Sequence, residues 1–513
     1  MDARPLSPEA WLERARERLL AGDSAGARAL LAEALAAHPG SGALQFALAG
    51  MQRQAGDGAA ADALLEALLA HQPAHLGAAL QLARSWRGQG RVLAAGAQLR
   101  RSFAQVPTEV ESRIDAIELL DDAGRQQDAL ALCEQAFAAG MDDPRLHVHA
   151  AALAAQLGRF DRAREHYETV LARSQKAAEW HVPLGLSSLQ RYRSADHPDF
   201  GRFERWLARD DLAPYPRSSL LFALGKAFDD IGATGRATEL LREANAIMHG
   251  QLRWPRKPWR RGVAMRLGRG PLPDPGLAPP RWCPVFIVGM PRAGSTLLAE
   301  QLARHPQVRH RGELPWLPVL AAGIGSAGGN AATVTAMREA ARAYAQQLLQ
   351  DDAAVGWYVD KQPHNFLHVD LILALFPNAR IIHCRREARD NALSLWMQSF
   401  HPGAQDFAYD FGDIATVMRD ARRLMDHWQT RFPHAVRTVD YESLVADPDA
   451  CLESIARWLD LPDATADAHA GAATPAISTA SLWQARQPVY CSSVERWRRY
   501  APHLPELERL RAD

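Results

Sequence analysis

The sequence predicts an α-helical repeat solenoid followed by an α/β domain with a parallel sheet, and three observations support this prediction. In the first part of the chain a glycine recurs every 34 residues, and an alanine follows each glycine five positions later. From about residue 284, short apolar runs alternate with helix-like segments. A fixed period of this length is typical of stacked helix–turn–helix units, whereas alternating strands and helices favour a parallel sheet.

The repeat positions predict where each helix pair turns and where it packs. Glycine suits a turn that needs a positive φ, and alanine suits the closest approach of two helices. A weaker unit follows around Gly232 and Ala237, and we expect residues 191–206 before it to be a longer connection. The periodic positions are Gly22, Gly56, Gly90, Gly124 and Gly158, then Ala27, Ala61, Ala95, Ala129 and Ala163, and finally Pro39, Pro73 and Pro107.

Composition limits the class of protein. A chain of 513 residues predicts two or three domains, and its 59 basic and 59 acidic side chains give no global field toward nucleic acid or membrane. The five scattered cysteines contain no CxxC pair, which argues against a disulfide framework and a structural zinc. A charged N-terminus and the lack of an apolar run of about 20 residues predict a soluble, cytoplasmic protein.

Changes in composition divide the chain into a repeat region (1–250), a linker (251–282) and an α/β domain (283–513). The linker is rich in proline and glycine, and from Arg253 to Arg269 it carries seven basic residues and no acidic one. Two interpretations stay open for this basic segment. It is either a solvated connector or a docking strip for an acidic partner.

The first apolar run of the α/β domain, VFIVG, continues through a glycine-containing loop at 289–296 into a helix. Such a loop can wrap backbone N–H groups around a phosphate, and the helix N-terminus adds its positive dipole. The loop resembles the nucleotide-triphosphate P-loop GxxxxGK[ST], but Ser295 occupies the lysine position. The nearest cation is Arg292, a placement that suits the 5′ phosphosulfate of an adenosine cofactor.

Residues 283–505 resemble sulfotransferases that use 3′-phosphoadenosine 5′-phosphosulfate (PAPS), in particular bacterial repeat-containing enzymes and protein-tyrosine sulfotransferases. The helical repeats resemble tetratricopeptide repeats. The resemblance implies a P-loop-like sulfotransferase domain that needs no metal and releases 3′,5′-ADP. It assigns the cofactor to Arg292, Ala293, Gly294, Ser295, Thr296, Arg386, Ser394, Tyr441, Ser481, Gln484, Arg486 and Arg496.

Two positions depart from the family pattern, and one assignment leaves a choice between two adjacent arginines. Ala293 replaces the usual serine after the loop arginine, and Gln398 replaces a second arginine of the 3′-phosphate clamp. In the stretch ARIIHCRREARDNALSLW the family places an arginine eight residues before a serine. This spacing favours Arg386 over the adjacent Arg385 as the partner of Ser394.

The resemblance also implies the catalytic groups. Glu313, in HPQVRHRGELP, is the base that takes the proton of an attacking hydroxyl. Lys361, in DKQPHNF, stabilises charge on the transferring group, and Ser481 lies near it. His364 is a competing base, but a structural histidine is the preferred interpretation.

The sequence therefore predicts transfer of a sulfuryl group from PAPS to a hydroxyl acceptor, which we expect to be a tyrosine of a peptide or protein. The repeats either bind this acceptor on their concave face or only assemble the protein, for example as a homodimer. Alternative acceptors are a small molecule, a glycan or a lipid. Two other classes remain: an ATP- or GTP-dependent kinase, disfavoured by the missing P-loop lysine, and a nucleotide-binding scaffold without catalysis.

Overall fold

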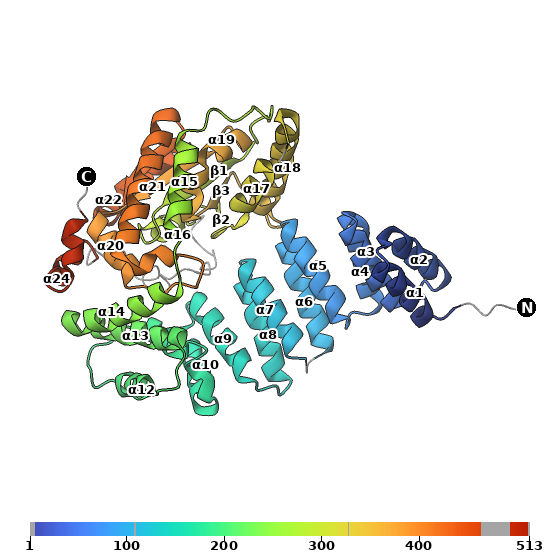
Figure 1. The fold of residues 1–513 in the computed structure, drawn as a ribbon, viewed down its shortest axis with the longest axis horizontal. Helices are drawn as coiled ribbons and strands as arrows, with labels where there is room; N and C mark the ends of the chain where they lie inside the picture. Colours follow the sequence, from blue (N-terminus) through green and yellow to red (C-terminus); the bar gives the residue numbers. More distant parts are fainter. Residues whose placement is uncertain (1–5, 107–108, 327, 463–492, 511–513) are drawn as a thin grey trace, which may run out of the picture. The chain divides into compact units, whose positions relative to one another are not determined.

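A computed structural model describes residues 6–106, 109–326, 328–462 and 493–510 (Figure 1). It divides into two compact units, of which the first comprises Met1–His149 with Gln350–Asp352 and the second comprises Ala150–Leu349 with Ala353–Asp513. The boundary between the units lies inside helix α9 (Pro144–Gln156). The domain limits at 250 and 282 mark a change in composition and stay predictions.

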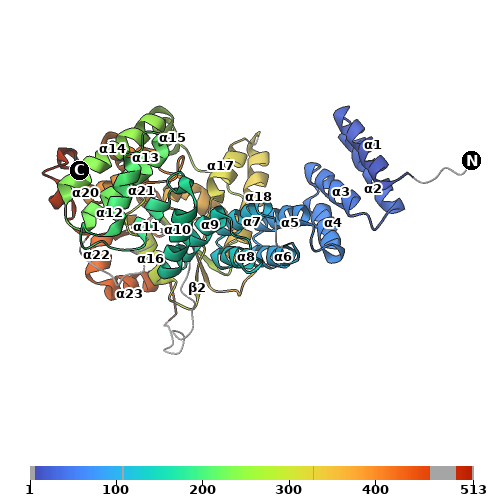
Figure 2. The ribbon, with the colours of Figure 1, turned by 90° about the horizontal axis from the view of Figure 1, so that it is seen from below.

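The helical region consists of antiparallel pairs, seen from a second side in Figure 2. The five periodic glycines have φ between 73° and 85°, and the five periodic alanines are at most 2% exposed, so the predicted turns and contacts are confirmed. The helices of the first unit are α1 (Pro8–Leu20), α2 (Ser24–Ala37), α3 (Gly42–Gln54), α4 (Gly58–His71), α5 (Leu76–Gly88), α6 (Val92–Gln105), α7 (Glu111–Asp122) and α8 (Gln126–Ala138).

Helices continue in the second unit, also where the sequence predicted connections. Helix α12 forms inside the expected connection because Pro198 starts it and its Phe200 and Phe203 side chains are buried. Helix α15 forms inside the expected linker, where Trp259 donates a hydrogen bond of 3.1 Å to Asp420 and Val263 is buried. These helices are α10 (Phe160–Arg173), α11 (Val182–Ser188), α12 (Pro198–Leu207), α13 (Pro214–Asp230), α14 (Thr234–Gln251) and α15 (Arg256–Leu267).

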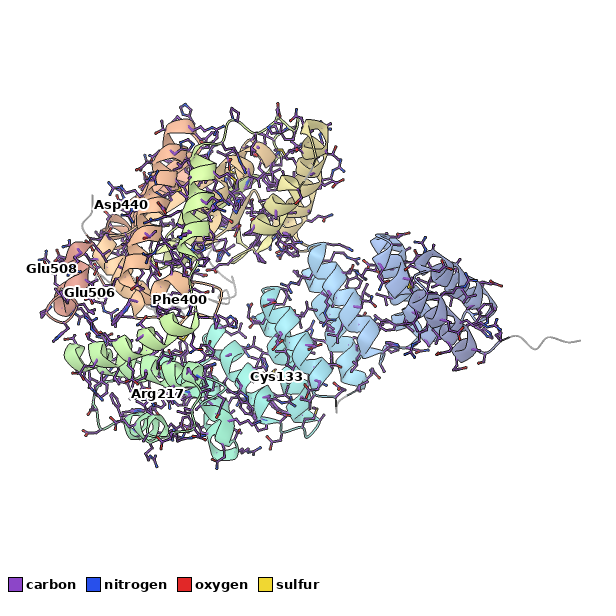
Figure 3. The ribbon with its side chains drawn as sticks, in the orientation of Figure 1. Cys133, Arg217, Phe400, Asp440, Glu506 and Glu508 are labelled. Atoms are coloured by element: carbon purple, nitrogen blue, oxygen red, sulfur yellow. The ribbon has the colours of Figure 1, made fainter. Side chains whose placement is uncertain are left out.

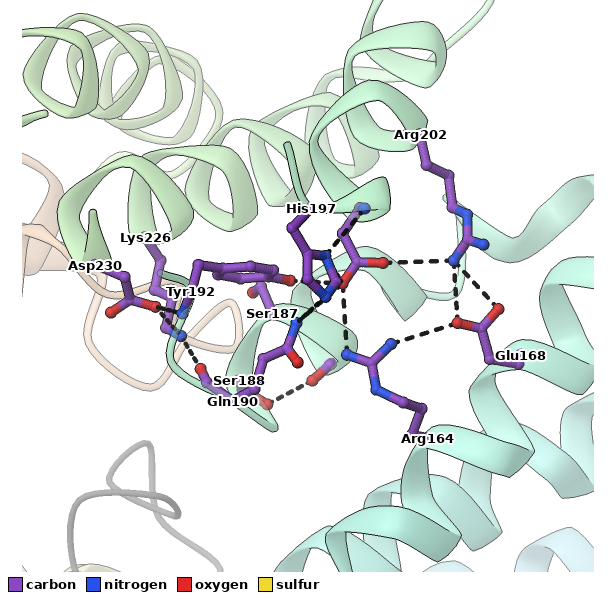
Figure 4. A network of polar contacts seen from close by, with 12 residues as sticks. Arg164, Glu168, Ser187, Ser188, Gln190, Tyr192, His197, Arg202, Lys226 and Asp230 are labelled. Carbon is purple, nitrogen blue, oxygen red and sulfur yellow. Dashed lines mark hydrogen bonds and ion pairs between the residues drawn. The ribbon is translucent and has the colours of Figure 1, made fainter. Parts of the chain in front are cut away.

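A polar network joins helices α10, α12 and α13 to the segment between α11 and α12 (Figure 4). The buried Asp199 accepts hydrogen bonds from the Tyr192 hydroxyl at 2.8 Å and the Gln190 amide at 3.2 Å, and it also contacts Arg164. Asp230 on α13 pairs with Lys226. Because buried carboxylates are stable only when they are paired or hydrogen-bonded, this network fixes the helices that precede the α/β part.

The α/β part contains a five-stranded parallel sheet of order β2-β3-β1-β4-β5 within the described residues. The three strands predicted from VFIVG, ARIIHC and AVRTVDY are confirmed as β1, β4 and β5. Strands β2 and β3 were not predicted, because runs of three and four residues give too little pattern. The strands are β1 (Cys283–Gly289), β2 (Val308–His310), β3 (Trp357–Asp360), β4 (Arg380–Arg385) and β5 (Val436–Asp440).

Helices pack against this sheet, whose central strand β1 is buried from Pro284 to Gly289. None of the helices described here has the length and apolarity that a membrane crossing requires. The helices are α16 (Ser295–Leu302), α17 (Trp316–Gly325), α18 (Asn330–Leu349), α19 (Val369–Leu375), α20 (Ala388–Trp396), α21 (Phe411–Arg431), α22 (Tyr441–Ala446), α23 (Pro448–Trp458) and α24 (Trp497–Tyr500).

Candidate active site

Each of the five strands leads, at its carboxyl end, toward a residue predicted for the site. The loop around Arg292 follows β1, Glu313 follows β2 and Lys361 follows β3. Arg386 follows β4, and Tyr441 follows β5. Because all strands are parallel, these ends lie at one edge of the sheet, and that edge is where open α/β sheets bind ligands.

The loop after β1 adopts backbone conformations that residues other than glycine rarely adopt. Gly289 has φ +139° and Gly294 has φ +95°, and Arg292 between them adopts a left-handed φ of 67°. A Cβ at Gly294 would lie 2.5 Å from Cδ2 of Tyr441, and a Cβ at Gly289 would lie 2.3 Å from the Cys384 carbonyl oxygen. The two glycines are therefore required for the turn that brings the N-terminus of α16 to the strand edge.

Helix α20 and Arg386, two residues before it, brace this loop. Nε of Arg292 donates to Oγ of Ser394 at 3.2 Å, and Nη1 of Arg386 donates to the Arg292 carbonyl at 3.1 Å. The buried Asn391 donates to the Pro291 carbonyl at 2.9 Å. Arg292 thus contacts both the arginine and the serine that lie eight residues apart in the sequence. Asn391, which was not predicted, contacts the same loop.

Arg386 also reaches the segment that follows residue 492. Its Nη2 donates to the Ser493 carbonyl at 2.8 Å, and its guanidinium carbon lies 4.6 Å from the ring centroid of Tyr441. The Tyr441 hydroxyl shares a hydrogen bond of 2.5 Å with Oγ of Ser493. Nε of Arg386 is buried and has no hydrogen-bond partner among the described residues. Arg386 therefore keeps a buried donor beside the loop.

The neighbouring Arg385 is oriented differently. It forms an ion pair of 2.6 Å with Asp440, labelled in Figure 3, and 60% of its side chain is exposed. That pairing occupies its guanidinium at the surface. Of the two adjacent arginines, Arg386 is the one that contacts the loop.

Glu313 and Lys361 form an ion pair across the neighbouring strands β2 and β3. The backbone N–H of Lys361 donates to the Gly312 carbonyl at 2.9 Å, and that of Leu314 donates to the Asp360 carboxylate at 3.2 Å. These two bonds flank Glu313 on both sides. They fix the distance between the predicted base and the predicted cation.

Asp360 was not predicted as a site residue, although it directly precedes Lys361 in the stretch DKQPHNF. Its carboxylate is fully buried and accepts hydrogen bonds from the Tyr344 hydroxyl and, at 2.8 Å, from Asn365. Burial raises its pKa to about 7, although the bonds from Tyr344 and Leu314 oppose this shift. The sequence carries no signal that the aspartate beside the candidate lysine is buried and hydrogen-bonded in this way.

His364 lies among aromatic rings. Its ring centroid is 5.8 Å from that of Phe366 and 6.2 Å from that of Phe407. Burial lowers the pKa of His364 to about 4, against a smaller opposing effect of Glu313, so the imidazole is neutral at pH 7. These surroundings favour the structural interpretation of this histidine over the role of base.

The structure describes only some of the remaining predicted residues. Ser481, Gln484 and Arg486 lie outside the described residues. Ala293 and Ser295 are buried at the loop, and Thr296 follows in the first turn of α16. Arg496 forms an ion pair with Asp229 of α13, a partner that the sequence did not predict.

Comparisons with known proteins agree with this architecture. Residues 284–465 match the model of the sulfotransferase family, and residues 120–182 match a tetratricopeptide repeat model. The α/β part is thus similar to the sulfotransferase family, and part of the helical region is similar to tetratricopeptide repeats. Both matches agree with the resemblance found in the sequence.

Individual relatives are more distant. An uncharacterized protein of Aquifex aeolicus is 29% identical over 69% of this chain and 48% of its own length. A putative protein-tyrosine sulfotransferase of Caenorhabditis briggsae is 24% identical over 34% of this chain and 65% of its own length. The chain thus spans about half to two thirds of these relatives. The crystal structure of a sulfotransferase from Mycobacterium avium is 17% identical, with a TM-score of 0.30 and coverage of 61% of this chain and 93% of that chain.

Proposed function

We propose that this protein transfers a sulfuryl group from PAPS to the hydroxyl of an acceptor, and that the acceptor is a tyrosine of a peptide or protein. The observation that carries the proposal is the convergence at the carboxyl edge of the sheet. The braced loop and Arg386 form one half of the site, and the Glu313–Lys361 pair forms the other. One half suits a nucleotide with two phosphate groups, and the other suits proton removal and charge stabilisation.

The proposed step is an in-line displacement. The acceptor oxygen forms a bond to sulfur while the bond from sulfur to the bridging oxygen of PAPS breaks, and 3′,5′-ADP leaves. Glu313 takes the proton of the acceptor hydroxyl. Lys361 donates to the bridging oxygen as negative charge develops there, and the positioning of both reactants supplies much of the rate.

The donor is assigned from the loop and its cations. The backbone at 292–296 and the dipole of α16 suit the 5′ phosphosulfate, and Arg386 with Ser394 suits the 3′-phosphate. A nucleoside triphosphate fits less well, because the position that holds lysine in P-loop proteins is Ser295. This distinction separates a sulfotransferase from a kinase.

The acceptor is assigned from charge. Lys257, Arg260 and Arg261 are exposed on α15, and none of them forms an ion pair with another described residue. On the opposite side, Trp259 of the same helix packs against Phe366, five residues after Lys361. A cationic helix face so close in structure to the lysine segment favours an acidic peptide that carries the tyrosine.

The test is an assay with [³⁵S]PAPS and an acidic tyrosine-containing peptide, run beside the same peptide with phenylalanine in place of tyrosine. The proposal predicts label on the tyrosine peptide alone. Labelling of neither peptide, while 3′,5′-ADP still binds, overturns the peptide acceptor and leaves a glycan, lipid or small molecule. If ATP binds and 3′,5′-ADP does not, the sulfotransferase assignment itself is wrong.

A further inference from the structure

The last part of the described chain is fastened to the helical region through one carboxylate. Asp229, near the end of α13, forms an ion pair with Arg496 and accepts a hydrogen bond from the hydroxyl of Tyr500. The side chains of Asp229 and Arg496 are only 13% and 19% exposed, and Tyr500 is fully buried. A helix of the predicted repeat region therefore contacts a residue predicted to hold the cofactor.

The residues on either side of Arg496 are held by a different helix. The backbone N–H groups of Glu495 and Trp497 donate to the carboxylate of Asp390 at 2.7 and 2.8 Å. Asp390 lies on α20, one turn before Ser394. Arg496 is thus held between the helix that carries Ser394 and the helix that carries Asp229.

Helix α14 reinforces this attachment. Arg242 forms an ion pair of 2.8 Å with Glu506, labelled in Figure 3, and donates to the His503 carbonyl. The buried Asn245 donates to the Trp396 carbonyl of α20 at 3.0 Å. Helix α24 lies beside α14 in Figures 1 and 2, and the two are in contact. The helix pair α13–α14 is therefore part of the frame around residues 493–510.

A buried guanidinium needs a counter-ion, and Asp229 supplies it. Burial would raise the pKa of Asp229, but the charge and hydrogen bond of Arg496 and the bond from Tyr500 outweigh it and lower this pKa. Arginine presents five N–H donors in a planar fork, so one edge can bind a carboxylate while other donors remain for a second anion. Asp229 engages Nη2 of Arg496.

We propose that Asp229 is a positioning residue of the donor site, which holds Arg496 in the orientation that binds the 3′-phosphate of the nucleotide. The proposal rests on the proposed function, because it needs a donor with a 3′-phosphate. It gives the last helix pair of the helical region a direct part in donor recognition. Arg496 then supplies a cation to the 3′-phosphate clamp, in which Gln398 replaces the second arginine of the family pattern.

The test compares two nucleotides on the full-length chain. Isothermal titration calorimetry measures the dissociation constants of 3′,5′-ADP and of 5′-AMP. The dissociation constant of 5′-AMP divided by that of 3′,5′-ADP reports recognition of the 3′-phosphate. Asp229→Asn is expected to lower this ratio about tenfold, equivalent to about 1.4 kcal/mol. Arg496→Gln is expected to lower it to a similar extent, and the double variant is expected to add nothing further.

The matched control is Asp230→Asn, one residue along the same helix, where the carboxylate pairs with Lys226 instead (Figure 4). Its ratio should equal that of the wild type. If the ratio in Asp229→Asn equals that of the wild type, or if this variant binds 3′,5′-ADP more tightly, the positioning role is overturned. If Asp229→Asn does not fold, Arg496→Gln and Tyr500→Phe decide, and a wild-type ratio in both overturns the proposal. A wild-type chain that binds both nucleotides equally contradicts the proposed donor instead.

Discussion

Lys361 is enclosed while its ion-pair partner Glu313 is not. The Lys361 side chain is 1% exposed, whereas 40% of the Glu313 side chain is exposed. The ammonium of Lys361 is thus enclosed by the protein, whereas the carboxylate of Glu313 is accessible from the surface. This asymmetry fits a stationary charge stabiliser and a base that must reach its substrate.

Lys361→Met is expected to lower kcat by about 10²–10³-fold, because removal of one preorganised donor to a developing negative charge has this effect. The dissociation constant of 3′,5′-ADP should change little, since the nucleotide contacts are assigned to other residues. Steady-state kinetics and calorimetry measure the two quantities. Lys176→Met, at an exposed lysine of the helical region, is the control. Equal loss of nucleotide affinity and of kcat would contradict the role in transfer.

Gly294→Ala is expected to abolish nucleotide binding. The new Cβ would meet the ring of Tyr441 at 2.5 Å and would force an alanine to adopt φ +95°, so the loop has to change shape. Gly250→Ala on α14, where nothing lies within 4 Å of the added Cβ, should bind normally. Calorimetric titration of both variants with 3′,5′-ADP is the measurement. Normal affinity in Gly294→Ala would remove the loop from the donor site.

Asp360 makes a pH-dependent contribution to stability. Its pKa is about 7 in the folded chain against 3.8 as the reference value, so between these pH values the folded state holds a proton that the unfolded state has released. Its contribution is therefore complete below about pH 4 and is lost as the pH rises through 7. Asp360→Asn should show a smaller decline in unfolding free energy between pH 5 and 8 than the wild type. Urea titrations at several pH values test this, and parallel profiles would contradict the assignment.

Reversing the charge of the exposed face of α15 tests the acceptor. The double variant Lys257→Glu/Arg260→Glu is expected to raise KM for an acidic tyrosine peptide several-fold at low salt, because surface charges act through a screened field. KM for PAPS and for a neutral tyrosine peptide should stay the same. A matched reversal at Arg14 and Arg18 of α1 should have no such effect. An equal change of KM with both peptides would show that the exposed face of α15 does not recognise the acidic residues of the peptide.

Ala61→Leu is expected to destabilise the helical region by about 1–3 kcal/mol, because overpacking forces neighbours out of their preferred positions. Ala61 on α4 is fully buried, where the periodic alanines allow close helix contact. Ala67→Leu, on the exposed side of the same helix, should change stability little. Chemical denaturation followed by circular dichroism measures both. Equal stability of the two variants would contradict the packing role of the periodic alanines.

The sequence predicted the features that depend on local pattern. The positive φ of Gly90 and the burial of Ala95 follow from the 34-residue period, and the loop before α16 follows from its glycines and its strand. Asp229 and Asp360 were not predicted. One pairs with Arg496, 267 positions away, and the other is an ordinary aspartate until the fold surrounds it with Tyr344 and Asn365. Contacts of this kind arise only from tertiary packing.

Helix α15 is a second feature that the sequence did not predict. Proline, glycine and arginine dominate the segment 251–282, so its composition predicts a connection. Trp259 and Val263 nevertheless lie four residues apart on one face, and packing of this face on the α/β part stabilises the helix. Two apolar residues are too few to predict a helix from periodicity alone.

The most direct test of the central claim is a crystal structure of the chain with 3′,5′-ADP. We expect the 5′-phosphate to lie against the backbone of residues 292–296 and the 3′-phosphate to lie within hydrogen-bond distance of Arg386 and Ser394. A nucleotide bound away from the carboxyl edge of the sheet, or no bound nucleotide at saturating concentration, would contradict this claim.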